Sequence, residues 1–119
     1  GVERLMRKYE FKPWGSFINI LDEEYTKVKQ IVIKPGESPS YQYHHKRSEI
    51  WVIVQGTAQV RLNDNSKTYG VGDVIKIPTL AKHQPKNIGD EDLIFVEIQL
   101  GEYFGEDDIV RLEDKYGRI

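Results

Sequence analysis

The 119-residue sequence contains no cysteine. This absence excludes disulfide bonds, thiolate metal sites and cysteine nucleophiles, so imidazole, carboxylate or amide groups must hold any metal ion. Long apolar runs are also absent. The longest strongly apolar run, Ile50–Val54, is far shorter than the roughly 20 residues of a membrane span. Residues 1–8 contain no apolar segment typical of a secretory signal. We therefore expect no membrane partner and a cytoplasmic location.

Neither sign of charge dominates the sequence. Seventeen basic residues stand against nineteen acidic ones, and no basic block is present that could follow the phosphates of a nucleic acid. We therefore expect no nucleic-acid partner. The two Trp, seven Tyr and four Phe exclude a disordered chain. Together with the length, they predict a single domain over residues 1–119, in which residues 1–11 form an N-terminal extension.

Short runs of strand-forming residues, separated by turn formers, recur along the chain. They lie at 28–33, 50–54, 58–62, 71–77 and 93–100, and Asn63-Asp64-Asn65 is typical of a hairpin turn. This spacing of about ten residues predicts an antiparallel all-β sandwich or barrel. Residues 105–114 carry acidic residues first and basic residues later, which predicts a short C-terminal helix.

The histidines belong to an ordered pattern of polar residues. Gln42 and His44 are two residues apart and therefore project from the same face of one strand. A turn at 45–48 lets Glu49 enter the next strand with the same orientation, and His83 comes from a strand distant in the sequence. One amide oxygen, two imidazoles and one carboxylate could then hold a divalent ion and leave a position open for water or substrate. A histidine in a strand is more often packed or exposed at the surface than bound to a metal ion.

This spacing resembles the two motifs of the cupin family. The first motif, G-x5-H-x-H-x4-E-x6-G, runs from Gly36 to Gly56 with Gln42 at the first histidine. The second, G-x5-P-x-G-x2-H-x3-N, runs from Gly72 to Asn87 with Leu80 at the inner glycine. The resemblance implies the cupin double-stranded β-helix, a jelly-roll barrel.

The sequence is more specifically similar to the cupin domain of type II phosphomannose isomerases, which usually follows a mannose-1-phosphate guanylyltransferase domain. The similarity covers about residues 8–118, and the family has a glutamine at the position of Gln42. It is carried by Lys12-Pro13-Trp14-Gly15-Ser16-Phe17, by Gln42 to Trp51, by Gly56-Thr57-Ala58 and by Glu97 to Arg118, where the last eight residues fit R-x-x-D-x-Y-G-R. The sequence departs from the family at 39–41, at Ile50 and at 79–82, which lie at the expected mouth of the site. It contains no Gly-rich nucleotide loop, so we expect that these residues alone make no sugar nucleotide.

The resemblance implies a metal-dependent aldose–ketose isomerase that interconverts mannose 6-phosphate and fructose 6-phosphate through a cis-enediol. One divalent ion, zinc in the first place and manganese, cobalt or nickel as alternatives, would be held by Gln42, His44, Glu49 and His83. The reaction needs a base, an electrophile for the enediolate and a cation for the phosphate.

Two residues are candidates for the remaining chemical roles. Arg111, from the terminal signature, is the candidate cation near the substrate, and a surface ion pair with Asp107 or Asp114 is its alternative. Glu97 is the candidate base because it lies on the polar face of an otherwise apolar strand, and exposure at a sheet edge is its alternative. Lys46 and Arg47 are expected in a solvated turn, and contact with the substrate phosphate is their alternative.

Three other functions remain open at this stage. The chain could be a non-catalytic metal-binding cupin that binds a sugar or a small polar ligand, an iron oxygenase, or a metal-free structural barrel. An iron oxygenase typically uses two histidines and one carboxylate, so Gln42 argues against it. The family also implies a homodimer and a separate mannose-1-phosphate guanylyltransferase as a possible partner.

Overall fold

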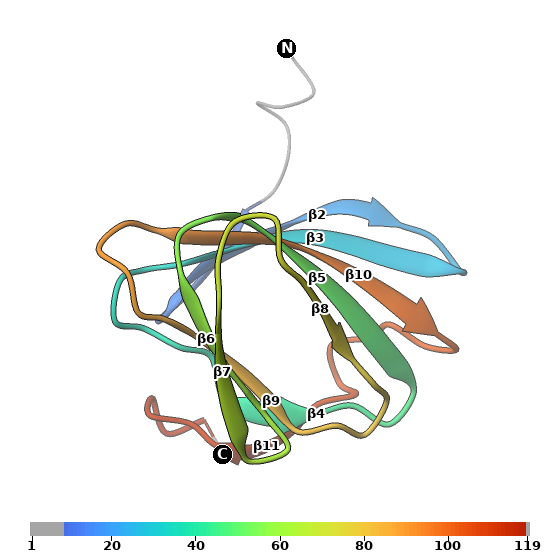
Figure 1. Ribbon diagram of the computed structural model, residues 1–119. Helices are drawn as coiled ribbons and strands as arrows, with labels where there is room; N and C mark the ends of the chain where they lie inside the picture. The colour runs from blue at the N-terminus through green and yellow to red at the C-terminus, as the bar shows by residue number, and fades with distance from the viewer. Residues whose placement is uncertain (1–8, 119) are drawn as a thin grey trace.

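Two antiparallel β-sheets face each other across a shared interior in the computed structural model, which describes residues 9–118 (Figure 1). These residues contain no helix, and so no helical segment among them could cross a membrane. The all-β prediction is confirmed. The strands are β1 (Tyr9–Lys12), β2 (Gly15–Asp22), β3 (Thr26–Ile33), β4 (Tyr41–Tyr43), β5 (Arg47–Gln55), β6 (Ala58–Leu62), β7 (Asn65–Tyr69), β8 (Val74–Ile77), β9 (His83–Asn87), β10 (Leu93–Gly101) and β11 (Val110–Glu113).

Pairing between distant segments builds both sheets. The six-stranded sheet has the order β1-β2-β3-β10-β5-β8, and the five-stranded sheet has the order β11-β4-β9-β6-β7. Strand β10 lies between β3 and β5 and is antiparallel to both. Three segments far apart in the sequence therefore form one wall of the barrel.

Two turns show how local sequence sets the connections. Leu62 pairs with Asn65, so β6 and β7 are joined by a two-residue turn at Asn63 and Asp64, with φ of 48° and 70°. Positive φ at both central residues is the type I′ geometry that suits a hairpin, and Asn and Asp tolerate it. This turn confirms the sequence prediction. Leu80, at the position of the motif's inner glycine, also has a positive φ of 71°.

The predicted helix at 105–114 is wrong. The segment turns at Gly105, whose carbonyl accepts a hydrogen bond from the Asp108 amide at 3.2 Å, and then forms β11 beside β4. A helix of about ten residues is marginal in water, whereas β11 pairs its backbone with an edge strand. Residues 9–11, expected in an extension, belong to β1, and residues 1–8 lie outside the described residues.

Apolar side chains from both sheets fill one end of the barrel. Trp51 and Phe95 are among the largest fully buried side chains, and their rings lie 4.8 Å apart between centroids. Trp14 and Trp51 are both buried. The core consists of Trp14, Phe17, Ile31, Ile33, Trp51, Ile53, Ala58, Val60, Ile75, Ile77, Ala81, Leu93 and Phe95.

Candidate metal centre and cavity

The inner face of the six-stranded sheet changes from apolar to charged along the strands. Alternate residues of β3, β5 and β10 point inward. Strand register places them in three cross-strand rows, which are Ile31–Phe95–Ile53, Lys29–Glu97–Trp51 and Lys27–Gln99–Glu49. The first row belongs to the core, and the other two bring charged groups into the interior. A cavity of about 400 Å³ opens at this polar end.

The two buried histidines point the same ring nitrogen toward one carboxylate. His44 follows β4, and its Nδ1 lies 2.7 Å from the Asp108 carbonyl oxygen. His83 begins β9, and its Nδ1 lies 2.9 Å from the Ala81 carbonyl oxygen. A carbonyl only accepts hydrogen bonds, so each Nδ1 is the donor, and each Nε2 is the atom that faces Glu49 and would bind a metal ion from the neutral imidazole. This is how proteins orient histidine ligands toward a metal ion.

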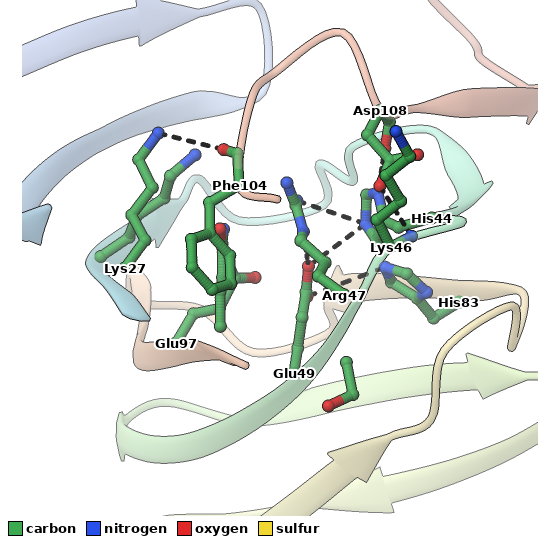
Figure 2. A network of polar contacts seen from close by, with 12 residues as sticks. Lys27, His44, Lys46, Arg47, Glu49, His83, Glu97, Phe104 and Asp108 are labelled. Atoms are coloured by element: carbon green, nitrogen blue, oxygen red, sulfur yellow. Dashed lines mark hydrogen bonds and ion pairs between the residues drawn. The ribbon is translucent and has the colours of Figure 1, made fainter. Parts of the chain in front are cut away.

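Glu49 lies where the two histidines meet (Figure 2). Its carboxylate oxygens are 3.2 Å from Nε2 of His44 and 3.9 Å from Nε2 of His83. The Trp51 indole and the Arg47 Nε each donate a hydrogen bond to it, at 3.0 and 2.9 Å. Burial alone would raise the pKa of Glu49, but the hydrogen bond from His44 and the charges of His83, His44 and Arg47 hold that pKa well below its usual range. Glu49 is therefore ionised, which is the state that a metal-binding carboxylate needs.

Gln42 is the fourth donor that the sequence predicted, and it lines the same cavity as the other three. It pairs with His83 across β4 and β9, and both residues line the cavity. The Gln42 Oε1 atom is buried without a hydrogen-bond partner among the described residues. Buried amide oxygens normally have a partner, so this one has an acceptor position to spare.

These residues fit a divalent metal ion. The ligand atoms of His44, Glu49 and His83 all lie within 4.8 Å of one another, and the three side chains are buried. Two imidazoles, a carboxylate and an amide oxygen form the mixed nitrogen and oxygen donor set that zinc and its neighbours accept. Burial of the Glu49 charge is costly, and a bound cation would add to the compensation that Arg47 already provides.

Arg47 is a site residue that the sequence analysis placed in a solvated turn. Its guanidinium is buried, and Nη2 lies 3.3 Å from Nε2 of His44 while Nε binds Glu49. The Nη1 atom has no partner within the described residues. Arg47 does not lie in a solvated turn, because β5 begins at this residue. Its position two residues before Glu49, on the same strand face, was the signal that could have found it.

Glu97 faces the cavity, not a sheet edge. It is buried, and the Gln99 amide donates a hydrogen bond to it at 2.8 Å. Burial, followed by the charge and hydrogen bond of Glu49, raises the pKa of Glu97 to about 8, so this carboxyl holds its proton near neutral pH. Figure 2 shows Glu97 on the side of Glu49 that faces Lys27, away from the histidines.

Arg111 lies on β11 opposite Gln42, at the rim of the same cavity. Its side chain is exposed and has no ion pair with Asp107 or Asp114 among the described residues. Asp114 instead accepts hydrogen bonds from the backbone and the guanidinium of Arg118, at 2.9 and 2.6 Å. This contact closes the C-terminal turn, so Asp114 and Arg118 hold the tail in place.

Comparisons with known proteins agree with this geometry. The family described as "Mannose-6-phosphate isomerase C-terminal" matches residues 2–114. Mannose-1-phosphate guanylyltransferase ManC of Salmonella typhimurium is 44% identical over 98% of this chain, which spans 24% of that protein. The chain thus covers about a quarter of the length of the curated relatives.

Solved structures support the fold. The oxalate decarboxylase of Lactobacillus farciminis, in a formate complex, has a TM-score of 0.80, 26% identity and coverage of 92% of this chain and 34% of its own. A Klebsiella pneumoniae protein with a double-stranded β-helix domain has a TM-score of 0.72, 21% identity and coverage of 81% and 77%. The chain is a cupin, and it belongs to the family of mannose-6-phosphate isomerase C-terminal domains.

Proposed function

We propose that this domain is a metal-dependent isomerase that interconverts mannose 6-phosphate and fructose 6-phosphate. The observation that supports it most strongly is that a buried metal-donor cluster and a buried carboxyl of raised pKa, Glu97, line the same cavity. The family match and the names of the relatives point to mannose phosphates as the substrate class.

The isomerisation moves one proton between neighbouring carbons. A base removes the proton from C2 of the open-chain aldose, the C1 carbonyl becomes an enediol, and a proton added at C1 with loss of the C2 hydroxyl proton leaves the ketone at C2. Atoms and electrons balance without an oxidant. A bound divalent ion would polarise the carbonyl and stabilise the negative charge of the enediolate.

The protein's own groups have distinct parts in this scheme. Glu97 is the group that carries the proton between C2 and C1, because it is a carboxyl inside the cavity: with a pKa of about 8, its ionised fraction at neutral pH accepts the proton from C2, and the protonated carboxyl returns it at C1. Trp51 and Arg47 hold Glu49 in place through hydrogen bonds. Arg111 at the rim is the cation that meets the substrate as it enters. Phe95 and Trp51 below exclude water from the reacting carbons.

A coupled assay of mannose 6-phosphate turnover tests the function. The protein is stripped with chelator and reloaded with zinc, manganese, cobalt or nickel in parallel. We expect turnover that disappears on stripping and returns with at least one ion. Absence of turnover with every ion would refute the isomerase and favour a binding module. Undiminished turnover after stripping would refute the metal dependence.

Glu97→Gln tests the role of the proton carrier. We expect turnover to fall by at least about 100-fold, the lower end of what a positioned acid–base group contributes. Zinc affinity, measured by competition with a chromophoric chelator, should change little, because Glu97 is not among the donors. Turnover close to that of the unaltered protein would remove Glu97 from the mechanism.

A further inference from the structure

One segment closes the polar end of the barrel. Residues 102–109, here called the strap, connect β10 to β11, and Glu106 and Ile109 of the strap line the cavity; Figure 2 shows the chain arching from Phe104 to Asp108. At one end of the strap the Lys27 Nζ, which does not line the cavity, donates to the Phe104 carbonyl oxygen at 3.4 Å. At the other end the Asp108 carboxylate accepts hydrogen bonds from the amides of His45 and Lys46, at 3.0 and 2.9 Å. The strap therefore connects β3, which carries Lys27, to the turn that follows His44.

Two buried lysines lie under the strap. Lys27 and Lys29 are only 7% and 4% exposed, and both point inward from β3. Both amines contact the same oxygen of Glu106, Lys27 at 3.4 Å and Lys29 more closely. Burial would raise the pKa of Glu106, but the charges of Lys29, Lys27 and Arg47 lower it. Two lysines therefore contact one carboxylate, and the charge of Arg47, which itself pairs with Glu49, acts on it from farther away.

This cluster has more positive charge than its own acid neutralises. Buried ammonium groups are costly unless each is paired, and one carboxylate shared by two lysines leaves an excess of one charge. The Arg47 Nη1 adds a buried donor without a partner among the described residues. Glu106 itself is half exposed, with 48% of its side chain accessible, so solvent reaches the carboxylate that occupies the cluster. Such an arrangement suits an anion with two charges.

The position of the cluster matches the geometry of a sugar phosphate. Lys29 pairs with Glu97, and Lys27 pairs with Gln99, which in turn pairs with Glu49 on the far side of β10. The lysine strand and the strand of the metal donor are thus two strand spacings apart, about 10 Å. That is comparable to the length of an extended six-carbon chain with a terminal phosphate. Glu97 lies on the strand between them.

We propose that Lys27 and Lys29, with Arg47, form the subsite for the phosphate monoester of the substrate, and that Glu106 occupies this subsite until the phosphate displaces it. This inference rests on the proposed function for the identity of the substrate. The strap then acts as a lid: the entering phosphate replaces the Glu106 carboxylate on the two lysines, and the hydrogen bonds at Asp108 keep the far end of the strap attached.

Inorganic phosphate is the probe that tests the subsite without any sugar chemistry. Its binding to the whole chain is measured by titration calorimetry for the unaltered protein and three variants. Lys29→Met removes a charged donor, so we expect phosphate affinity to fall about 10- to 100-fold. Glu106→Gln removes a half-exposed competing anion and should raise the affinity about two- to fivefold. Lys67→Met, at an exposed lysine of β7 in the other sheet, is the matched control and should change nothing.

Lys29→Met and Glu106→Gln should change the phosphate affinity in opposite directions, which general damage to the fold would not produce. Phosphate binding by Lys29→Met equal to that of the unaltered protein would overturn the subsite. Weaker phosphate binding by Glu106→Gln would overturn the proposal that phosphate displaces the Glu106 carboxylate. Phosphate binding as predicted, without isomerase turnover, would keep the anion site and refute the proposed function. Turnover with an unchanged KM in Lys29→Met would keep the function and refute the subsite.

Discussion

Trp51→Phe tests whether the buried indole holds Glu49 as a metal ligand. The indole Nε1 donates to Glu49 at 3.0 Å inside a side chain that is only 2% exposed, so phenylalanine keeps most of the packing and removes the donor. Loss of a hydrogen bond to a charged group costs about 1.5–3 kcal/mol. The smaller ring leaves roughly 40 Å³ empty, which costs about 1 kcal/mol more. We expect the free energy of unfolding to fall by about 3 kcal/mol in urea titrations.

Metal affinity separates this role from packing alone. Removal of a group that orients a ligand typically lowers metal affinity about 10- to 100-fold, so competition with a chromophoric chelator should show zinc binding weakened by that factor. Trp14→Phe is the matched control, because Trp14 also lines the cavity and is 7% exposed, yet its indole makes no hydrogen bond within the described part of the chain. That variant should lose about 1 kcal/mol or less and keep its zinc affinity. Equal zinc affinities in the two variants would refute the role of Trp51.

Three further substitutions test residues that stabilise the fold around the site. Asp114→Asn should lower the free energy of unfolding at neutral pH by about 1–2 kcal/mol, because Arg118 loses its buried carboxylate partner. The hydrogen bond from Arg118 lowers the pKa of Asp114 below its usual 3.8. The unaltered protein should therefore keep this stabilisation above pH 3.8 and lose it as the pH falls through the lowered pKa. The free energies of unfolding of the two proteins, plotted against pH, should converge in acid. Gly101→Ala should lower the free energy of unfolding by several kcal/mol in a urea titration, because a Cβ there lies 2.2 Å from a backbone oxygen of the turn into β5. Gly70→Ala, with open space around the added Cβ, is the control and should change this free energy little. Asn87→Ala should cost about 2–4 kcal/mol by calorimetry, because the buried amide binds three backbone groups, and it should leave zinc affinity unchanged. A stable Asn87→Ala protein would contradict the structural role given to this motif residue.

The metal donors could be predicted because their spacing is local. Gln42 and His44 share a strand face through the period of two, and the turn before Glu49 is short. His83 lies far away in the sequence, and only the resemblance to the cupin motifs connected it to the others. The structure brings His83 beside Gln42 through the pairing of β9 with β4. Whether all four bind one ion remains a prediction.

The charged interior could not be predicted from strand patterns. In β3, Lys27 and Lys29 alternate with Val28 and Gln30, a pattern equally typical of an exposed face. What places them inside is the cross-strand pairing of β3 with β10, where Glu97 meets Lys29. In β10 the apolar residues Ile94, Val96, Ile98 and Leu100 lie on the outer face, and the polar ones point inward. Burial of that kind depends on tertiary partners.

The C-terminal segment also could not be predicted from local sequence. Acidic residues at 106–108 resemble the first turn of a helix, but Glu106 pairs with the lysines of β3 and Asp108 with the amides beside His44. Long-range ion pairs outweighed the local preference. The homodimer and the separate guanylyltransferase partner stay predictions.

Zinc K-edge X-ray absorption of the zinc-loaded protein tests the central claim most directly. It reports which atoms surround the ion and at what distance. We predict one zinc per chain with two imidazoles at about 2.0–2.1 Å and oxygen ligands at about 2.0–2.2 Å, and the loss of one imidazole in His83→Ala. A spectrum without imidazole scattering, or one that His83→Ala leaves unchanged, would contradict the assignment of His44, Glu49 and His83 as the metal centre.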